Sequence, residues 1–194
     1  MKKNNFANFL FEAATLKRLQ RTGWQILGEN RESIAEHSYM VAVVSFTLAV
    51  KTKADLEKIL LMALFHDFVE TRTGDIYKLS DLYVKADEKK AVLDVFSGLP
   101  FGGRIIGLVE EYRKNKTLES KIIHDADTLA LCIELKQLIE NGYQKAKEWY
   151  NANLEKLELL ESKKLAKEIN TSNSQDWWKK ERDKIHSDFF KKVK

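Results

Sequence analysis

Cysteine and long apolar runs are both scarce in this sequence. Cys132 is its only cysteine, so the chain cannot form an intramolecular disulfide, which fits a reducing compartment. Apolar runs such as residues 41–46 and 59–65 are much shorter than the roughly 18 residues that a membrane-spanning helix needs. The basic N-terminus is followed by neither a long apolar stretch nor a cleavage site of small residues. These absences predict a soluble, unprocessed protein of the cytoplasm that has no membrane partner.

Proline and glycine are also rare, with one and eight occurrences among 194 residues. Strands and tight turns usually show such residues together with alternating apolar and polar positions, and this chain offers little of either. Its apolar residues instead recur at helical spacing, as in Ile34, Val41, Val44 and Leu48. We therefore predict an all-α fold, with residues 1–194 forming a single domain.

Charge of one sign does not dominate the sequence. The net charge of +4 comes from 33 basic and 29 acidic residues, which are interspersed. A nucleic-acid-binding protein usually carries a basic stripe instead. Basic residues gather most visibly toward the C-terminus, at 179–180 and 191–194, which is more typical of a solvated helix than of a binding arm. We expect no nucleic-acid partner.

Caps and periodicity give approximate helix boundaries. Ser33 and Glu36 have the spacing of a capping box, in which each side chain bonds the backbone amide of the other residue, so a helix is predicted over about residues 34–51. An earlier helix is expected over residues 5–21, and a later one over about residues 54–70. The remaining helices are predicted at residues 87–96, 105–114, 118–141, 144–167 and 174–190.

The clearest chemical signal is the pair His66-Asp67 at the end of the apolar run 59–65. Burying an imidazole and a carboxylate is costly unless they are paired or coordinated, and a shared divalent cation would satisfy both. Nitrogen and carboxylate ligands together favour Mn, Fe, Co, Ni or Zn over Ca or Mg. Glu70 follows His66 by four residues, so a helix brings it onto the neighbouring surface. Taken alone, the pair could equally be a hydrogen-bonded core pair.

Two further places in the sequence raise the odds of a metal site. His37 shares the apolar face of its helix, although an isolated histidine there is more often bonded to a carbonyl group than to a metal. Residues 124–127, His-Asp-Ala-Asp, open another apolar helical run. One of its acids could reach inward, and the spacing alone does not choose between Asp125 and Asp127.

The combination of these motifs resembles the H…HD…D pattern of the HD-domain phosphohydrolases. Five segments are similar to the 5′-deoxynucleotidase subgroup of that superfamily: residues 16–24, 32–38, 66–75, 111–112 and 126–127. The resemblance covers about residues 8–145, and the C-terminal helices expected over 146–190 lie beyond it. It implies an all-helical, usually dimeric enzyme that hydrolyses deoxynucleoside 5′-monophosphates to deoxynucleoside and phosphate.

The resemblance also implies roles for individual residues. One divalent metal ion would have four ligands: His37, His66, Asp67 and Asp127. Asp127 is preferred to Asp125 because it follows a small residue and precedes the apolar helix, as in the family motif. Glu70 and Asp75 match the catalytic acids of the family. The substrate would be bound by a partly overlapping set: Arg21, Trp24, Asp67, Asp75 and Lys78.

Two departures from the family pattern bear on substrate preference. Two residues separate Arg21 from Trp24, whereas some relatives have the pair adjacent, and Trp24 is equally well interpreted as a core aromatic. Where some relatives have Thr or Pro after the second acid, this chain has residues 76–78, so Lys78 could contact the phosphate instead. The pair Trp177-Trp178 lies beyond the resemblance and is interpreted as packing or dimer-interface residues, or as a lid.

Other functions remain alternatives at this stage. The same site could act on a deoxynucleoside triphosphate, a cyclic nucleotide or another phosphoester. In a different class, the chain could be a nucleotide-binding helical protein that uses the metal structurally. The sequence contains no GxxxxGK[ST] phosphate-binding loop, so a nucleotide-triphosphate motor is not supported.

Overall fold

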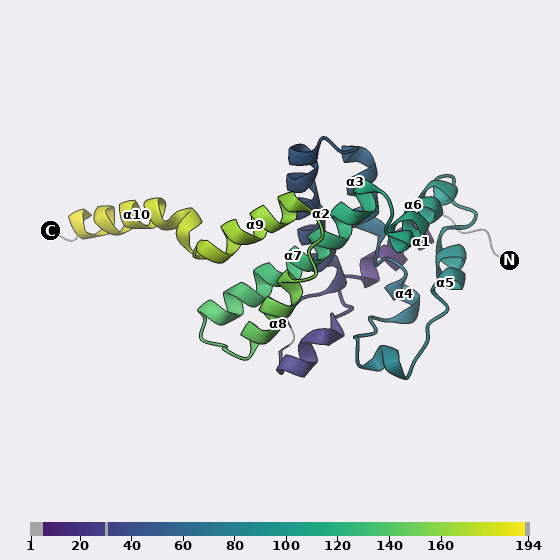
Figure 1. The fold of residues 1–194 in the computed structure, drawn as a ribbon, viewed down its shortest axis with the longest axis horizontal. Helices are drawn as coiled ribbons and strands as arrows, with labels where there is room; N and C mark the ends of the chain where they lie inside the picture. Colours follow the sequence, from purple (N-terminus) through teal and green to yellow (C-terminus); the bar gives the residue numbers. More distant parts are fainter. Residues whose placement is uncertain (1–5, 30, 193–194) are drawn as a thin grey trace.

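The computed structural model describes residues 6–29 and 31–192, and only the backbone of residues 188 and 190–192. Within these ranges the regular elements are helices and no strand occurs, which confirms the all-α prediction (Figure 1). The α-helices are α1 (Phe6–Thr15), α2 (Ile34–Thr52), α3 (Leu56–Phe65), α4 (Glu70–Thr73), α5 (Glu88–Phe96), α6 (Gly102–Lys114), α7 (Leu118–Glu140), α8 (Ala146–Leu154), α9 (Leu160–Thr171) and α10 (Lys179–Lys192). The 3₁₀ helices are η1 (Thr22–Leu27), η2 (Ser80–Leu82) and η3 (Asp176–Trp178).

Side-chain caps fix the starts of the long helices. Ser33 Oγ accepts a hydrogen bond from Glu36 N at 3.3 Å, and Glu36 Oε2 accepts one from Ser33 N at 2.7 Å, which is the predicted capping box of α2. Thr117 and Ser120 form a second capping box at the start of α7. Asp55 caps α3. Each cap stabilises its helix by about 1 kcal/mol and fixes where that helix begins.

Two predicted helix ends near the site are wrong. The first helix ends at Thr15, not near residue 21, because the chain then pairs with the segment that leads into α2. Arg21 N donates to Glu32 O at 3.0 Å, and Ile34 N donates to Leu19 O at 2.8 Å. A continuous helix could not make these long-range backbone bonds. The helix predicted to reach residue 70 likewise ends at Phe65, and a turn separates it from α4.

The helix predicted over residues 144–167 is also wrong, because two helices, α8 and α9, occupy this range. Between them, the backbone N–H groups of Glu158 and Leu159 each donate to the Asp125 carboxylate at 2.9 Å. A buried acid on α7 therefore holds the break in place. The predicted helix start at residue 5 and the basic residues 193–194 lie outside the described residues.

The core forms where α2, α3 and α7 pack on one another. Ile34, Ile59, Ile122 and Leu129 are fully buried in the larger apolar cluster. A smaller cluster joins η1 to the C-terminal half of α7 and to α8, with buried members Trp24, Leu27, Cys132, Leu135, Leu138, Ala146 and Tyr150. The larger cluster holds α2, α3 and α7 in fixed relation, and these helices position the candidate site.

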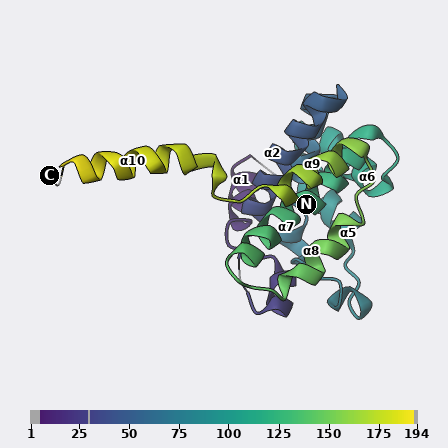
Figure 2. The ribbon, with the colours of Figure 1, turned by 60° about the vertical axis from the view of Figure 1, so that its left-hand side comes forward.

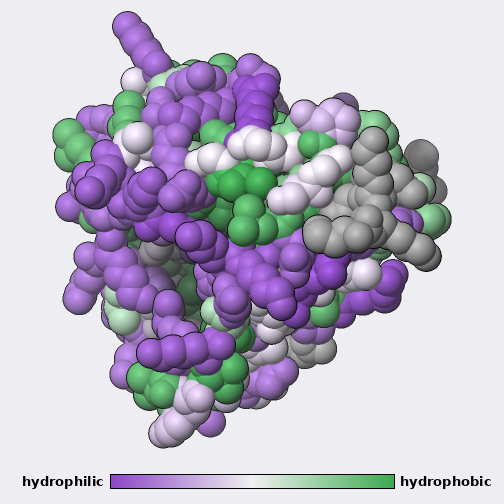
Figure 3. Space-filling model, turned by 90° about the vertical axis from the view of Figure 1, so that its right-hand side faces the viewer, coloured by the Kyte–Doolittle hydropathy of each residue, from purple (hydrophilic) through white to green (hydrophobic). Residues whose placement is uncertain are grey.

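One end of the molecule is a packed face, whereas a helix projects from the other end. The face at the right of Figure 1 is mostly hydrophilic, with apolar residues gathered in a small patch near its centre (Figure 3). At the opposite end, α10 extends away from the packed helices in two different views (Figures 1 and 2). Among the residues that the structure describes, no helix combines the length and apolarity needed to cross a membrane.

Candidate active site and metal centre

Three elements bring one group of ligand side chains together. His37 lies in the second turn of α2, His66 directly follows α3, and Asp127 lies in α7. One ligand atom of each residue lies within 4.8 Å of those of the other two, and both imidazoles are buried. Ligand atoms that share one ion are separated by at most about 4.4 Å, since each is about 2.0–2.2 Å from it. The three groups are therefore arranged closely enough to hold one cation after a small contraction.

Both imidazoles turn their Nε2 atoms toward this cluster. His66 Nδ1 donates to the Ala63 carbonyl at 2.8 Å, which leaves its Nε2 as an acceptor. Asp127 Oδ1 lies 2.9 Å from His37 Nε2, but the contact lacks hydrogen-bond geometry. Within the described part of the chain, the buried Nε2 atoms of His37 and His66 make no hydrogen bond. Leaving such atoms unpaired costs roughly 1–3 kcal/mol each, so a cation bound by both nitrogens fits the site.

Asp67, the fourth predicted ligand, lies at the edge of this group. Its Oδ2 is 3.2 Å from His66 Nε2 and 3.9 Å from His37 Nε2. Burial opposes ionisation of Asp67, but the two histidines outweigh it and hold the pKa of this carboxyl below its usual range. For Asp127, burial is likewise outweighed by His37 and Arg21, so its pKa is well below the usual range. Both acids are carboxylates at neutral pH, which is the form that binds a cation.

Glu70 behaves in the opposite way. Burial first, and then the negative charges of Asp67 and Asp75, raise the pKa of Glu70 to about 10. Its buried Oε2 has no hydrogen-bond partner among the residues described. The group therefore combines two ionised acids with one that keeps its proton at neutral pH. Neighbouring acids with pKa values pushed apart in this way are typical of sites that perform acid–base chemistry.

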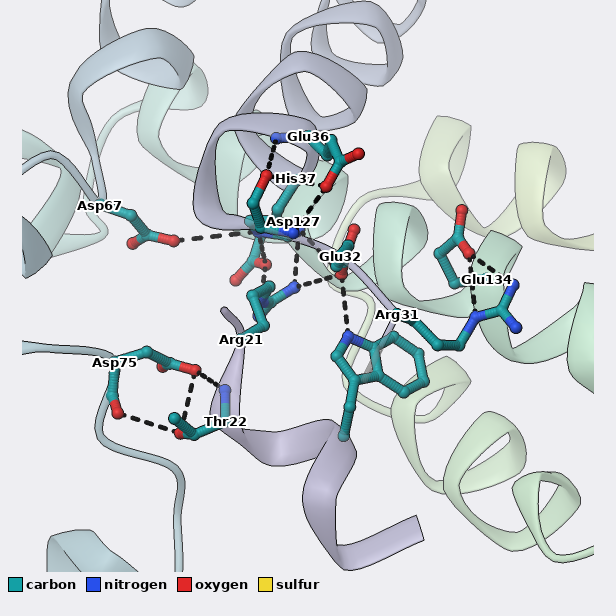
Figure 4. A network of polar contacts seen from close by, with 12 residues as sticks. Arg21, Thr22, Arg31, Glu32, Glu36, His37, Asp67, Asp75, Asp127 and Glu134 are labelled. Atoms are coloured by element: carbon teal, nitrogen blue, oxygen red, sulfur yellow. Dashed lines mark hydrogen bonds and ion pairs between the residues drawn. The ribbon is translucent and has the colours of Figure 1, made fainter. Parts of the chain in front are cut away.

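Arg21 reaches the ligand group from the turn that precedes η1 (Figure 4). Its Nη1 donates to Glu32 Oε1 at 3.3 Å and to His37 Nδ1 at 2.6 Å, and its Nη2 lies 3.8 Å from Asp127 Oδ1. Burial lowers the pKa of the guanidinium, but Asp127, followed by other acids, outweighs this effect. Arg21 is therefore a charged donor located beside the candidate ligands.

Glu32 is a buried carboxylate, only 6% exposed, behind Arg21. Its Oε1 accepts from Trp24 Nε1 at 3.2 Å as well as from Arg21, and it lies 3.8 Å from His37 Nδ1 (Figure 4). The ring of Trp24 is itself 2% exposed and packs in the smaller apolar cluster. This burial favours the core-aromatic interpretation of Trp24 over direct contact with a substrate.

Asp75 is fixed by the residue that follows Arg21. Thr22 N donates to Asp75 Oδ2, and Thr22 Oγ1 lies 3.0 Å from the Asp75 carbonyl oxygen (Figure 4). The candidate phosphate-binding arginine and the second candidate acid are therefore tied to each other. Lys78 is exposed, and the structure joins it by hydrogen bond or ion pair to none of the residues that it describes. Its contact with phosphate stays a prediction.

Asp125 and Asp127 lie on different sides of α7. Two positions along a helix differ by roughly 200° in direction, so the two side chains leave α7 on opposite sides. Asp125 is 2% exposed and accepts the backbone bonds that hold the start of α9. Asp127 points toward His37, so it is the acid of this pair that lies with the candidate ligands.

Sequence reasoning gave no role to Glu32, Thr22 or Tyr112, although all three lie close to the site. The Tyr112 ring meets the His66 ring edge-on, with centroids 5.4 Å apart, and stacks on His124 at 4.2 Å. All three stand in segments that carry the family resemblance, and this was the signal in the sequence that could have pointed to them. Their contacts depend on how the chain packs, and no periodicity or motif spacing reports them.

Comparisons with known proteins agree with this geometry. A sequence model of the HD domain family matches residues 13–173. A Dictyostelium discoideum protein named 5′-deoxynucleotidase HDDC2 is 30% identical over 155 residues, covering 73% of this chain and 81% of that protein. A Danio rerio protein of the same name is 30% identical over 144 residues, covering 71% of each. A conserved hypothetical protein from Pyrococcus furiosus, known from a solved structure, has a TM-score of 0.73 and 34% identity, covering 86% of this chain and 99% of that one.

The family match spans α2, α3 and α7, the elements that supply the candidate ligands. It also includes Arg21 and Glu70, which adjoin them. The same helical fold is shared with a solved structure over most of both chains. On this evidence the chain belongs to the HD-domain family.

Proposed function

We propose that this protein is a metal-dependent 5′-deoxynucleotidase, which hydrolyses deoxynucleoside 5′-monophosphates to deoxynucleoside and phosphate. The observation that carries the proposal is the pair of buried histidines with unpaired Nε2 atoms, beside ionised acids and the partly exposed Arg21. The two relatives named 5′-deoxynucleotidase support the substrate class.

The metal would be held by His37, His66, Asp67 and Asp127. Two nitrogens and two carboxylates suit an ion such as Mn, Fe, Co, Ni or Zn. When bound, such an ion supplies Lewis acidity toward the phosphate and lowers the pKa of a coordinated water. A ligating histidine usually donates its other nitrogen to a carboxylate. In this structure His37 Nδ1 accepts from Arg21, so binding of a metal through Nε2 would require Arg21 to release Nδ1 and Glu32 Oε1, 3.8 Å away, to become its acceptor.

Arg21 would bind the substrate phosphate. Its planar guanidinium can pair two donors with two phosphate oxygens, which a lysine cannot copy. Because Arg21 now contacts Glu32, His37 and the Asp127 carboxylate, it is held in the site before any substrate arrives. Such positioning, together with neutralisation of charge, is most of what phosphoryl transfer requires.

Glu70 and Asp75 would handle the protons. Glu70 would orient the attacking water and accept its proton on a carboxylate oxygen, which requires that nearby positive charge first lower its raised pKa. Asp75, held by Thr22, would hydrogen-bond the sugar or the water and help protonate the leaving 5′ oxygen. No covalent intermediate with the protein is needed.

The remaining features of the proposal concern setting and assembly. Lys78 would contact the phosphate from the segment after Asp75, and Trp24 would support the site through Glu32. We further propose that residues 1–194 act as one domain, that the enzyme works in the cytoplasm without nucleic-acid partners, and that it is a homodimer.

The test is phosphate release from dAMP, dGMP, dCMP, dTMP and dUMP, with AMP as the ribonucleotide comparison. The protein is stripped of metal and then supplied separately with Mn²⁺, Co²⁺, Ni²⁺, Zn²⁺ or Mg²⁺. We expect activity on the deoxynucleotides that returns with a transition metal, and little release from AMP.

Two variants make the result specific. Asp67→Ala should abolish activity and metal binding, whereas Asp125→Asn, which alters an acid bonded to the α9 backbone, should retain bound metal. Equal rates on AMP and dAMP would refute the preference for deoxyribose. Release of triphosphate from a deoxynucleoside triphosphate would assign the site to a different phosphoester.

A further inference from the structure

Helix α2 is apolar on both of its sides. One side, with Val41, Val44 and Leu48, is buried in the core. The opposite side exposes four large apolar residues, Tyr39 by 68%, Val43 by 44%, Phe46 by 47% and Val50 by 58%. A helix that is apolar all round is normally buried, and a contiguous exposed apolar patch usually marks an interaction surface. These four residues, which we call the α2 stripe, therefore form an apolar surface suited to contact with another helix or protein.

The α2 stripe continues into a groove at the N-terminal end of the helix. This groove has a volume of about 500 Å³, and Tyr39 belongs to both the stripe and the groove. Its other lining includes Met40, two basic residues (Lys17 and Arg31) and three acids (Glu32, Glu36 and Glu134). An apolar stripe that ends in a mixed-charge groove is suited to an amphipathic helix carrying charges of both signs.

The same chain contains a helix of that kind. The C-terminal arm, defined as residues 176–192 (η3 and α10), leaves the packed helices (Figures 1 and 2), and its substantial packing is between η3 and α10 themselves. Trp177 is 82% exposed and Ile185 62% exposed. A 14-residue helix such as α10 is only marginally stable alone in water, so it needs a surface to pack on.

The spacing of apolar positions on the arm matches that of the α2 stripe. Tyr39, Val43, Phe46 and Val50 are separated by steps of four, three and four residues. On the arm, the apolar residues Trp178, Ile185 and Phe189 have the spacing of Tyr39, Phe46 and Val50. Arg182, which lies over the Trp178 ring, stands at the position that corresponds to Val43. In each row the first and last residues are eleven positions apart, which is about 16 Å along an α-helix. Steps of four and three are those by which two helices interlock side chains along a shared seam.

We propose that the C-terminal arm of one copy packs along the α2 stripe of a second copy, so that the two copies exchange arms. This rests on the homodimer proposed above and is independent of the hydrolase activity. The ion pair between Lys51 and Glu168 places α9 beside the end of α2. From there the arm runs away from the packed helices (Figures 1 and 2), so the α2 of a second copy fits it better than the α2 of its own chain. The arm also lies outside residues 13–173, the span matched by the family.

The first test measures association of the full chain by sedimentation and light scattering over a range of concentrations. Phe46→Glu alters the stripe and Ile185→Glu alters the arm, and both residues are exposed, so the fold should survive. Leu93→Glu on α5 is the matched control, since Leu93 is 43% exposed, much like Phe46. Each of the first two variants should weaken dimerisation by at least tenfold, while Leu93→Glu should leave it unchanged. Circular dichroism checks that all three variants stay helical.

The second test asks which helices meet. In a Cys132→Ser background, copies carrying Ile185→Cys are mixed with copies carrying Val43→Cys or Phe46→Cys and then oxidised. A disulfide between copies is expected for one of the two pairings, Val43 if the helices run antiparallel and Phe46 if they run parallel.

Each contrary result has a distinct meaning. A monomer at every concentration would overturn both the exchange and the homodimer. A dimer weakened by Phe46→Glu but not by Ile185→Glu would overturn the exchange and leave α2 faces meeting directly. A monomer in which Val43→Cys and Ile185→Cys on one chain form an internal disulfide would overturn it in favour of the arm folding back. None of these outcomes depends on phosphate release, so they stay separable from a failure of the proposed activity.

Discussion

Replacing Glu70 with glutamine is expected to remove activity and, at the same time, to stabilise the metal-stripped protein. Glu70 is buried among acids, and its pKa is raised to about 10. Glutamine has nearly the same shape and no proton to lose. The variant therefore keeps the packing of Glu70 but removes the cost of ionising an acid in this environment.

The size and pH dependence of the effect follow from the pKa values. The ordinary pKa is 4.5, so the folded protein binds this proton more tightly than the unfolded chain does. The stability contributed by this proton is fully present below pH 4.5 and is lost as the pH rises toward 10. At about 1.4 kcal/mol per pH unit, the loss reaches up to about 4 kcal/mol at pH 7.5. Glu70→Gln should recover much of it, with about 2–4 °C in melting temperature for each kcal/mol.

The assay is thermal unfolding of chelator-treated protein at pH 5, 6.5 and 8. The melting temperatures of wild type and Glu70→Gln should nearly coincide at pH 5 and separate steadily toward pH 8. Glu110→Gln is the control: Glu110 is an exposed acid paired with Lys114 on α6, so its effect should stay within about 0.5 kcal/mol. A gain that does not change with pH, or a variant less stable than wild type at pH 8, would refute the burial argument.

Adding the metal separates the two roles of Glu70. A divalent cation beside Glu70 favours its ionised form, so the stability advantage of glutamine should shrink when Mn²⁺ is restored. Under those conditions the wild type should turn over and the variant should be slower by about 100-fold or more, as for loss of a general base. Full activity in Glu70→Gln would remove Glu70 from the mechanism.

Four other substitutions have defined outcomes. Asp127→Asn should release bound metal, as measured by elemental analysis, whereas Asp125→Asn should keep the metal and lower the melting temperature, because it weakens the bonds to the start of α9. Arg21→Lys should raise KM for the phosphate substrate by about 10–100-fold, since one bidentate contact is lost, and an unchanged KM would place the phosphate elsewhere. Glu32→Gln should weaken metal affinity by about 10–100-fold in a titration, because His37 Nδ1 then lacks a carboxylate acceptor, and unchanged affinity would exclude this role.

Helix starts could be predicted most closely where a side-chain cap lies next to them in the sequence. Ser33 and Glu36 indicate the start of α2, because each side chain can bond the backbone amide of the other residue three positions away. The structure confirms that a helix begins there. The end of α1 at Thr15 depends instead on backbone bonds to residues 32–35. No local pattern reports a bond across more than ten residues, so periodicity extended that helix too far.

The residues of the candidate site also differ in whether the sequence alone can reveal them. His66-Asp67 was visible because a charged pair at the end of an apolar run is costly without a partner. Glu32 was not visible as a supporting residue, because its burial comes from Trp24 and Arg21, which contact it only in the folded chain. Residue type can therefore suggest metal ligands, whereas the groups that orient them depend on tertiary contacts.

Helix α7 contains both a candidate ligand that residue type suggests and an acid whose role depends on tertiary contacts. Asp127 on one side of α7 faces His37, and Asp125 on the other side bonds the backbone that begins α9. The same two-residue spacing that made the sequence ambiguous thus directs one acid toward the candidate ligands and the other toward the start of α9. Because α9 leads to η3 and α10, the position of the C-terminal arm is tied to the helix that holds a candidate metal ligand. We therefore predict that a change that tilts α7 affects the proposed metal site and the proposed exchange of arms together.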